Sequence, residues 1–472
     1  METARRAKRG TYTAVGVMVL LLAVALFYAV TYQRARTTTA PSTTTTAVSY
    51  PLTSDWLTYH LDNLRDGDYS FLPPIASPSL KWKATFDGAV YSEPLVFDGS
   101  VFIATESDTV YSVSAATGAV EWTESLGTPA PLSTLLCGDI DPVGITGTPV
   151  IDPSANTLYV VAMEKGQGYT LFALNTSSGS VLWSERIDPP GFNFTVEQER
   201  GALTLYDGVV YVPFGGFAGD CGQYHGWVVG YPANGTSATL DYQVPSGREA
   251  GIWTPGGVVV STSGKLYLAT GNSASRTVFD YGEADIELRP NLTVVSYFAP
   301  QDWVVLNDND LDLGSLPPVL LSDGLLFQIG KQGIGFLLNS TALGGVGGQL
   351  YSANICGNGF GSWGAEAFYN DSVYIPCDNG MFAISVHGGA SPSFGASWND
   401  TGFNCGPPIL AAGALWTIDV DNGTLLALNP ETGATLFTAS IGQQSSRFTT
   451  PSAGDGLLYA AAGDTVFAFS PQ

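Results

Sequence analysis

The sequence predicts an all-β protein in which eight repeated sheet modules close into a ring, and three observations lead to this prediction. Short apolar strands alternate with tight turns, as in residues 415–440, where Asp421-Asn422-Gly423 accepts the positive φ that a hairpin needs. The same order of elements recurs along the chain. The 56 glycines and the aromatic content of 12% suit many tight turns between half-buried strands.

The repeats are counted by treating one aromatic residue in each second strand as equivalent. The eight residues are Phe102, Tyr159, Tyr211, Tyr267, Phe327, Tyr374, Trp416 and Tyr459. A meander this short cannot bury its own faces, so each copy must pack on its neighbours. The spacings of 42 to 60 residues suit four-stranded blades of a β-propeller with loops of variable length.

A turn motif accompanies the repeats: a glycine is followed, after three further residues, by an aromatic residue. It occurs as Ala115-Ala116-Thr117-Gly118 with Trp122, as Gly179 with Trp183 and as Gly433 with Phe437. The motif resembles the repeat of quinoprotein-type propellers, which are named for enzymes of pyrroloquinoline quinone (PQQ). The resemblance covers residues 80–472 and implies an eight-bladed quinoprotein-like β-propeller. This fold hosts both enzymes and assembly scaffolds, so the resemblance predicts the fold rather than the function.

The N-terminus predicts a membrane anchor. Residues 1–10 are a basic tail with four positive charges, and residues 11–32 are uncharged and largely apolar. About 20 such residues span a bilayer as a helix. Two further basic residues follow the span, so the charge bias places the tail in the cytoplasm and the propeller outside. The apolar region of a signal peptide is shorter, and we expect an uncleaved single-pass anchor. The alternatives are a cleaved signal peptide and processing after Arg9-Gly10, as in archaeal pilin-like signals.

Two segments lie between the anchor and the ring. Residues 33–49 are a Thr-rich linker of low complexity that cannot pack a core, and we expect an extended stalk. Residues 50–79 resemble the lead-in of some propellers of this class and predict a cap over the ring, with His60 in a structural role. The residues that carry this second resemblance are Trp56, Tyr59, His60, Asp62 and Arg65.

The two ends of the propeller domain, residues 80–472, predict how the ring closes. Residues 80–86 form a strand without partners in a module of its own, and residues 449–472 are one strand short. Pairing the two would remove exposed sheet edges. The expected modules are 90–142, 143–190, 198–246, 251–300, 312–355, 361–400, 405–442, and 449–472 joined by 80–86.

The chain is strongly acidic. It has 42 Asp and Glu residues against 18 Lys and Arg residues, which gives a net charge of −24. Such a surface repels nucleic acid and anionic lipid headgroups, so no nucleic-acid partner is expected. It suits cations, cationic partners, or an acidic or saline habitat, and general solubility is the plainer explanation.

Eight Asn-x-Ser/Thr sequons predict an exposed, glycosylated surface. Several fall in predicted turns, where a glycan is sterically allowed, and an archaeal envelope protein is the interpretation that we favour. The sequons are Asn175, Asn193, Asn234, Asn291, Asn339, Asn370, Asn399 and Asn422.

Five cysteines are present, and an extracytoplasmic location permits disulfides. Cys356 and Cys377 flank one predicted strand pair, and Cys137 and Cys221 lie in consecutive long loops, so each pair is a candidate bridge. Cys405 is then left over. Connectivity is not readable from sequence. The chain has no C-x-x-C and no C-x-x-C-H, which disfavours zinc ribbons and c-type haem.

The resemblance also implies a quinone site between residues 251 and 339. It assigns Trp253 as the floor under the quinone, Asn272 as a Ca²⁺ ligand, Asp302 as the general base and Lys331 as the quinone contact. Two departures count against such a site. The family's metal-binding Glu has only Asp220 as a substitute, and the adjacent-cysteine disulfide of many of these enzymes is absent.

Two functions follow from these observations. We expect a membrane-anchored, non-catalytic binding or scaffold protein of the cell envelope, with envelope proteins or glycans as partners and no cofactor. The alternative is a PQQ- and Ca²⁺-dependent alcohol or sugar dehydrogenase. No nucleophile elbow or phosphate-binding glycine loop appears, and the three histidines are scattered.

Overall fold

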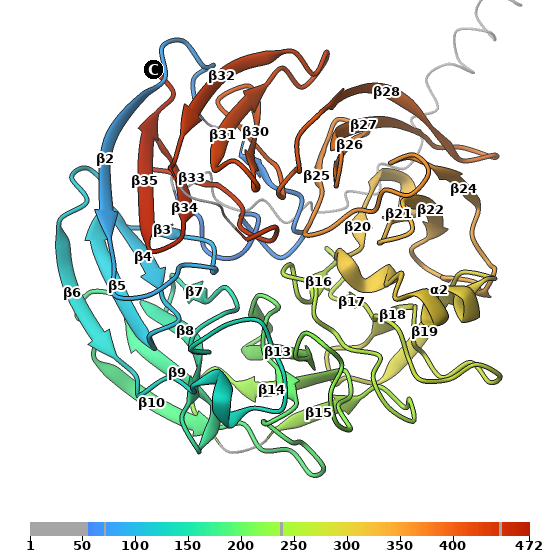
Figure 1. The fold of residues 1–472 in the computed structure, drawn as a ribbon, viewed down its shortest axis with the longest axis horizontal. Coiled ribbons are helices and arrows are strands. Elements are labelled where there is room, and N and C mark those ends of the chain that lie inside the picture. The colour runs from blue at the N-terminus through green and yellow to red at the C-terminus, as the bar shows by residue number, and fades with distance from the viewer. Residues whose placement is uncertain (1–54, 70–71, 237–238, 443–445) are drawn as a thin grey trace, which may run out of the picture. The chain divides into compact units, whose positions relative to one another are not determined.

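The strands form a ring of eight sheets, numbered here as modules 1 to 8 (Figure 1). The computed structural model describes residues 55–69, 72–236, 239–442 and 446–472. The predicted tail at 1–10, anchor at 11–32 and linker at 33–49 lie outside these residues. Within the described ranges, no helix is long and apolar enough to cross a membrane.

Each module has four principal antiparallel strands. They are β3 (Leu95–Phe97), β4 (Ser100–Ala104), β5 (Thr109–Ser114) and β6 (Val120–Ser125) in module 1; β7 (Val150–Asp152), β8 (Thr157–Glu164), β9 (Gly168–Asn175) and β10 (Val181–Arg186) in module 2; β12 (Thr204–Tyr206), β13 (Val209–Gly216), β14 (Trp227–Pro232) and β15 (Leu240–Gln243) in module 3; β16 (Val259–Val260), β17 (Leu266–Ala269), β18 (Asp285–Leu288) and β19 (Val294–Ala299) in module 4; β20 (Val319–Leu320), β21 (Leu325–Gln328), β22 (Ile334–Asn339) and β24 (Tyr351–Asn354) in module 5; β25 (Ala367–Tyr369), β26 (Ser372–Cys377), β27 (Gly380–His387) and β28 (Ser393–Thr401) in module 6; β29 (Ile409–Ala411), β30 (Ala414–Asp419), β31 (Thr424–Leu428) and β32 (Thr435–Ser440) in module 7; and β33 (Ser452–Gly454), β34 (Leu457–Ala462), β35 (Thr465–Ser470) and β2 (Ser79–Thr85) in module 8.

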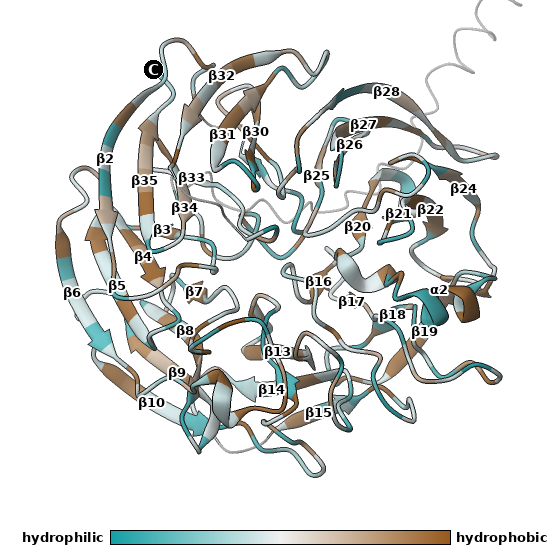
Figure 2. Ribbon diagram, viewed as in Figure 1, coloured by the Kyte–Doolittle hydropathy of each residue, from teal (hydrophilic) through white to brown (hydrophobic). Residues whose placement is uncertain are grey.

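Short elements extend this plan. Within the described ranges, three sheets gain a two-residue strand, and the connections carry one α-helix and three 3-10 helices. The extra strands are β1 (Asp68–Tyr69), β11 (Glu197–Gln198) and β23 (Gly345–Val346); the helices are α2 (Trp303–Asn309), η1 (Leu132–Thr134), η2 (Leu313–Ser315) and η3 (Ser322–Gly324). In Figure 2 the strands carry most of the brown, hydrophobic colour, because their side chains fill the space between neighbouring sheets.

The predicted ring closure is confirmed. Strand β2 pairs antiparallel with β35, from Ser79 opposite Ser470 to Thr85 opposite Thr465. Figure 1 shows the blue β2 beside the red β35. The two ends of the propeller therefore share one sheet, and module 8 has no missing strand.

The eight aromatic residues used to count the repeats are structurally equivalent. Each lies on the second strand of its module and pairs with the first residue of the first strand, as in Leu95 opposite Phe102 and Ser452 opposite Tyr459. The same register holds in the other six modules. The eight-bladed prediction is confirmed at the level of single residues.

Tryptophans on outermost strands pack on the next module. Trp82 and Trp122 each lie against a glycine with positive φ in the following sheet, and their indole Nε1 groups donate hydrogen bonds of 2.8 Å to carbonyl oxygens there. A Cβ on any of these glycines would collide with the indole, so the turn requires glycine. The four pairs are Trp82 on Gly118, Trp122 on Gly179, Trp183 on Gly235 and Trp398 on Gly433.

The segment from residue 55 to residue 69 runs along the inner strands and is deeply buried. Arg65 is 1% exposed and donates hydrogen bonds to the carbonyl oxygens of Tyr59 and Leu203. His60 is fully buried beside the Thr450 hydroxyl, at 3.1 Å, and burial lowers the pKa of His60 to about 3. His60 is therefore a neutral structural residue, as expected. Backbone hydrogen bonds tie the segment to modules 1, 2, 4, 6 and 7.

Candidate functional site

Lys331 is the centre of the most distinctive charged arrangement in the ring. It lies in the turn between β21 and β22 with a side chain that is 11% exposed. Its Nζ is 2.6 Å from Asp312 Oδ2 and 2.8 Å from Asp310 Oδ1. The same ammonium lies 5.3 Å from the ring centre of Trp253 and 4.7 Å from that of Trp363. Two carboxylates and two indoles thus hold one cation.

Three aromatic residues from different modules meet at this point. Trp253 precedes β16, Trp363 precedes β25 and Phe448 precedes β33. The two indoles are 6.2 Å apart at an angle of 46°, and Phe448 is 6.0 Å from Trp253 in an edge contact. Each residue lies in the connection that enters the innermost strand of its module, four to six residues before that strand begins.

Two arginines complete the group. The guanidinium of Arg200 lies 3.9 Å from the ring centre of Phe448, and that of Arg447 lies 4.5 Å from the ring centre of Trp363. Arg447 Nη1 is also 3.9 Å from Asp378 Oδ1. We call Trp253, Trp363, Phe448, Lys331, Arg200 and Arg447 the inner cluster. It is an alternating set of rings and cations.

Burial controls the electrostatics around Lys331. Burial lowers the pKa of Lys331, but the carboxylates of Asp312 and Asp310 outweigh it and raise that pKa above the ordinary value. Burial raises the pKa of Asp312, and Lys331 acts in the opposite direction. Glu283 is fully buried nearby and accepts a 2.6 Å hydrogen bond from the backbone N–H of Leu313. The ammonium group of Lys331 is therefore held firmly in the inner cluster, and few charged groups of the cluster are left to bind a ligand.

The structure brings two of the four residues predicted for a quinone site into contact, because Trp253 and Lys331 both belong to the inner cluster. Asn272 approaches through its backbone, whose N–H donates a 2.6 Å hydrogen bond to Asp312 Oδ1. Asp302 is exposed at the start of α2 and accepts a 2.9 Å hydrogen bond from Gln332 Nε2. Among the described residues, no contact links Asp302 with Trp253 or Lys331.

Asp220, the candidate substitute for a metal-binding glutamate, also has another partner. Its Oδ1 accepts a 2.6 Å hydrogen bond from the hydroxyl of Tyr224. Across the described ranges, no three His, Cys, Asp or Glu side chains gather into a group that could hold a metal ion. The donors present do not fit a Ca²⁺ site of the expected kind, which takes six to eight oxygen ligands.

Sequence reasoning missed several residues of this site, although the repeats contain a signal for them. Arg200, Trp363 and Phe448 each lie eleven residues before the counted aromatic residue of their module. Tyr91 and Thr148 occupy the same position in modules 1 and 2, and they line one small cavity with Arg200 and Phe448. Asp310 and Asp312 stand in the run Asp-Asn-Asp-Leu-Asp at 308–312, which alternates carboxylates shortly before Lys331.

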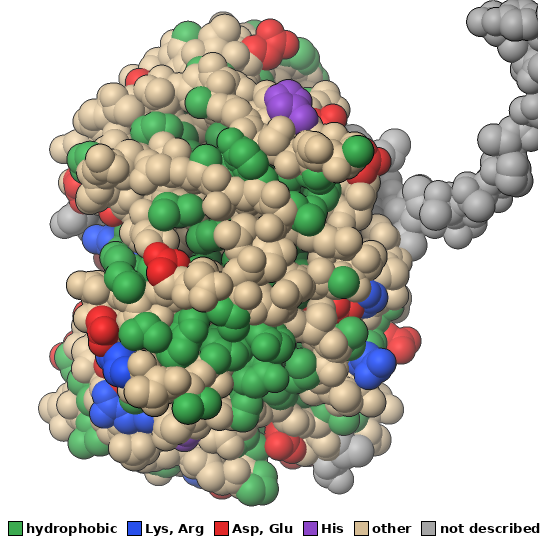
Figure 3. All heavy atoms as spheres, turned by 90° about the vertical axis from the view of Figure 1, so that its right-hand side faces the viewer, with side chains coloured by type: hydrophobic (Ala, Val, Ile, Leu, Met, Phe, Trp, Pro, Cys, Tyr) green, Lys and Arg blue, Asp and Glu red, His purple; other side chains and the backbone are tan. Residues whose placement is uncertain are grey.

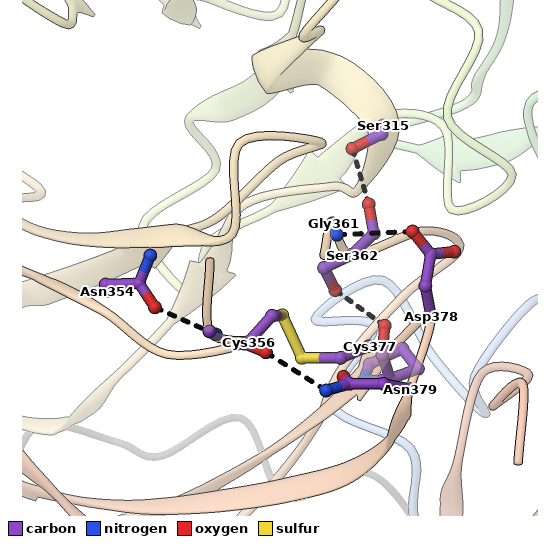
Figure 4. The surroundings of a disulfide bond; sticks show 10 residues. Ser315, Asn354, Cys356, Gly361, Ser362, Cys377, Asp378 and Asn379 are labelled. Atoms are coloured by element: carbon purple, nitrogen blue, oxygen red, sulfur yellow. Dashed lines mark hydrogen bonds between the residues drawn. A yellow bond between two sulfur atoms is a disulfide. The ribbon is translucent and has the colours of Figure 1, made fainter. Parts of the chain in front are cut away.

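Both candidate disulfides are present, between Cys137 and Cys221 and between Cys356 and Cys377. Cys405 is free and buried. Figure 4 shows the second bridge, which joins the loop after β24 to the end of β26 and so links modules 5 and 6. The predicted pairing is confirmed for both bridges.

The sequons are sterically accessible. Seven of the eight asparagines are exposed, and Asn175 is half-buried. The side chains of Asn193, Asn234, Asn291 and Asn339 accept hydrogen bonds from the backbone two residues on, which holds these turns at the surface. Glycosylation at these positions stays a prediction.

The outer face near α2 is notably apolar. Figure 3 shows green hydrophobic side chains gathered on the side of the ring that carries α2, β19 and β24. Val305 of α2 is 50% exposed and Val295 of β19 is 39% exposed. An exposed apolar area of this kind is typical of interaction surfaces.

Comparison with known proteins concerns the repeats and the fold. A family model described as "Outer membrane protein assembly factor BamB" matches residues 75–274. The curated protein of that name from Yersinia pestis is 30% identical over 106 residues, which are 22% of this chain and 23% of the relative. The aligned stretch thus spans less than a quarter of that relative's length. The expected resemblance to quinoprotein-like propeller repeats is confirmed.

Solved structures show the same fold at low identity. Quinohemoprotein alcohol dehydrogenase from Comamonas testosteroni has a TM-score of 0.70 at 16% identity, covering 89% of this chain and 80% of the enzyme. A europium-containing methanol dehydrogenase has a TM-score of 0.67 at 14% identity, covering 88% of this chain and 98% of the enzyme. BamB from Moraxella catarrhalis has a TM-score of 0.55 at 14% identity, covering 84% of this chain and 98% of that protein.

Proposed function

We propose that this chain, a quinoprotein-like β-propeller, is a membrane-anchored, extracytoplasmic and non-catalytic scaffold of the cell envelope, with envelope proteins or glycans as partners. Three features support the proposal: the apolar span at residues 11–32, the exposed sequons and the likeness to outer membrane assembly factors. The apolar surface around α2 and the acidic composition are suited to protein contacts.

The observation that carries the non-catalytic part is the closed packing of the inner cluster. A flat ring inserted between two others needs about 3.5 Å on each side, or roughly 7 Å in all. The indoles of Trp253 and Trp363 are 6.2 Å apart and tilted by 46°, and Lys331 lies over both of them. On the side of Trp253 that faces Trp363, the chain's own side chains therefore leave no room for a further flat ring.

A PQQ- and Ca²⁺-dependent dehydrogenase is the second candidate function. It is favoured by the contact of Lys331 with both Trp253 and Asp312 at one point of the ring. The fold likeness to alcohol and methanol dehydrogenases agrees with it but concerns the fold alone. Against it stand the filled space between Trp253 and Trp363 and the absence, in the described ranges, of a gathered set of metal ligands.

Reconstitution separates the two functions. The full-length protein is incubated with PQQ and Ca²⁺, and dye-linked oxidation is measured over a panel of primary alcohols and sugars. The scaffold proposal expects no saturable quinone uptake and no turnover. Turnover that is lost on Asp312→Asn and retained on Asp302→Asn would overturn it, because only Asp312 contacts Lys331. Loss on Asp302→Asn alone would instead assign Asp302 as the base.

The anchor is tested separately. Membranes from cells that express the full chain are extracted with carbonate, and a separate sample of intact cells is treated with protease from the outside. We expect the protein to stay with the membrane and its propeller to be cleaved in intact cells. Release by carbonate, or protection of the propeller until the cells are lysed, would contradict the proposed topology.

A further inference from the structure

A polar pocket lies at the junction of modules 6 and 7, and none of the residues predicted for a quinone site lines it. Its volume is about 500 Å³, within the usual range for small-molecule sites. The turn between β26 and β27, the segment after β28 and the turn between β30 and β31 form its walls. We call it the rim pocket, and its lining includes Asp378, Asn379, Thr401, Phe403, Asn404, Asp421 and Asn422.

One wall of the rim pocket is fixed covalently. Asp378 and Asn379 directly follow Cys377, which is bonded to Cys356 (Figure 4). Asn379 Nδ2 donates a 3.2 Å hydrogen bond to the carbonyl oxygen of Cys356. Asp378 Oδ2 accepts a 3.2 Å hydrogen bond from the N–H of Gly361, and the Asp378 N–H donates to the Gly361 carbonyl at 2.9 Å. A wall held in this way loses little conformational entropy when a ligand binds.

The opposite wall presents unused acceptors. Asn404 Nδ2 donates to Asp421 Oδ1 at 3.2 Å, and Asn422 Nδ2 donates to Asp419 Oδ2 at 2.8 Å. These bonds orient the two carboxamides and leave Asn404 Oδ1, Asn422 Oδ1 and Asp421 Oδ2 without a hydrogen-bond partner in the part of the chain that the structure describes. The free oxygens can accept hydrogen bonds from a ligand that carries several donors.

The remaining lining narrows the class of ligand. The Thr401 hydroxyl can donate or accept, and the half-buried Phe403 ring gives the pocket one apolar surface. A neutral sugar combines adjacent hydroxyl groups with an apolar C–H face, which matches both features. A cation fits less well, because Arg447 lies 3.9 Å from Asp378 and already supplies positive charge at that wall.

We propose that the rim pocket binds a neutral oligosaccharide through its vicinal hydroxyl groups. Asp421, Asn404 and Asn422 accept the hydroxyl hydrogen bonds, and Phe403 packs on the sugar ring. This inference rests on the proposed envelope function and specifies the glycan among its partners. The pocket is open to solvent, which suits the end of a longer glycan chain.

The test uses the full-length protein made in a host that does not glycosylate Asn422. Calorimetry measures binding of maltotriose, cellotriose, laminaritriose, mannotriose and chitotriose, with pentalysine as the cationic probe. We expect saturable binding of at least one trisaccharide, weakened about tenfold or more by Asp421→Ala and by Asn404→Ala, since about 1.4 kcal/mol corresponds to tenfold. Thr401→Val is the milder variant, and Asp241→Ala, at an exposed position on β15, is the matched control that leaves binding unchanged.

Three outcomes would overturn the proposal. They are no binding of any trisaccharide at millimolar concentration, equal binding by Asp421→Ala and wild type when both have the same melting temperature, or selective binding of pentalysine that is lost on Asp421→Ala. The last result would assign the pocket to a basic peptide. None of them concerns the inner cluster, so failure here is distinguishable from failure of the quinone test.

Discussion

The ring has two arcs that are held together differently. From module 8 through modules 1, 2 and 3, each interface is made by an outer-strand tryptophan on a glycine of the next sheet: Trp82 on Gly118, Trp122 on Gly179 and Trp183 on Gly235. From module 3 through modules 4, 5 and 6, the described chain has no such pair. There, the hydroxyls of Tyr211 and Tyr267 reach carbonyl oxygens of the next module, as that of Tyr159 also does in the first arc. One disulfide links modules 5 and 6, and the first arc contains the other, between Cys137 and Cys221.

The second arc is also where the irregular features lie. It carries α2, the run at 308–312, Lys331 and one wall of the rim pocket. A repeated interface stabilises the ring with little variation, because each copy uses the same turn and the same indole. Where that interface is lost, loops can lengthen and the sequence can place charged residues, and other contacts must supply the stability. The regular arc, modules 8, 1, 2 and 3, repeats one interface, whereas the irregular arc, modules 4, 5 and 6, supplies Trp253, Lys331 and Trp363 to the inner cluster. Arg200 and Phe448 reach the same cluster from the regular arc.

The largest expected effect is in the regular arc, at the closing strand. Trp82 is 8% exposed, lies against Gly118 and donates to the carbonyl of Ala115. We expect Trp82→Ala to lower the free energy of unfolding by about 4 kcal/mol, the usual cost of deleting a large buried side chain. Denaturant unfolding followed by circular dichroism measures it. Leu80→Ala, on the same strand at 50% exposure, is the control, and an equal loss in both variants would refute the role of the indole.

The next effect tests whether the disulfide replaces the missing indole in the irregular arc. Cys356 and Cys377 are 21 residues apart in sequence. We expect the double replacement by alanine to lower the free energy of unfolding by about 3 kcal/mol, since the unfolded chain gains freedom. Hydrogen exchange should speed up first in β24 and β26. A loss below about 1 kcal/mol, or faster exchange confined to module 1, would show that other contacts hold this interface.

A third effect is the pH dependence that one buried carboxyl group gives to the regular arc. Glu106 is buried in the regular arc, and although the Gly144 N–H bonds to it at 2.6 Å, burial raises the pKa of Glu106 to about 7. A raised folded-state pKa gives stability that is complete below the ordinary value of 4.5 and is lost as the pH rises through 7. From pH 5 to pH 7 we expect this group to remove about 2 kcal/mol.

The measurement is the melting temperature of wild type and Glu106→Gln across that pH range. The variant should have a flatter profile, because glutamine cannot ionise. Thr146, Arg200 and Asp139 also act on this carboxyl group and are left unchanged in both proteins. Parallel profiles would contradict the assignment of the slope to Glu106.

The smallest effect concerns the hydroxyl contacts of the irregular arc. Tyr211 is buried, and its hydroxyl donates a 2.8 Å hydrogen bond to the carbonyl of Pro290 in module 4. Tyr211→Phe should cost about 1 kcal/mol of unfolding free energy, the usual net value of one hydrogen bond. Tyr206→Phe is a matched control, because the Tyr206 hydroxyl has no hydrogen-bond partner in the described ranges. A cost as large as that of Trp82→Ala would erase the distinction between the arcs.

Sequence reasoning recovered most of the fold because the repeats encode it directly. The counted aromatic residues, such as Phe102 and Tyr459, fall in one register because a blade tolerates no shift of its second strand. The closing strand at 80–86 and both disulfide pairs were predicted for similar reasons: an unpaired sheet edge and the proximity of consecutive loops constrain the alternatives.

The candidate site was predicted only in part. Trp253 and Lys331 were predicted for a quinone site and lie in the inner cluster, and the assignment of Asp302 as a base stays a prediction. The chain after α2 turns back and brings Asp310 and Asp312, which were not predicted, to Lys331. The local sequence does not indicate which residues such a loop contacts when it folds back. The repeats were aligned on the counted aromatic residues of their second strands. The position eleven residues before each of these aromatic residues was overlooked, and it supplies Arg200, Trp363 and Phe448. The predicted anchor lies outside the described residues.

Pairing of β2 with β35 sets an order of events during biosynthesis. The strand that begins the circle emerges from the ribosome early, whereas its partner is complete only when Ser470 has been made. Throughout that interval the nascent propeller is an open ring with an unpaired strand edge at each end. Synthesis must therefore either finish before other chains pair with those edges, or the edges must be shielded until the last strand arrives. A nonsense change near the end of the gene would be far more damaging than its few lost residues suggest.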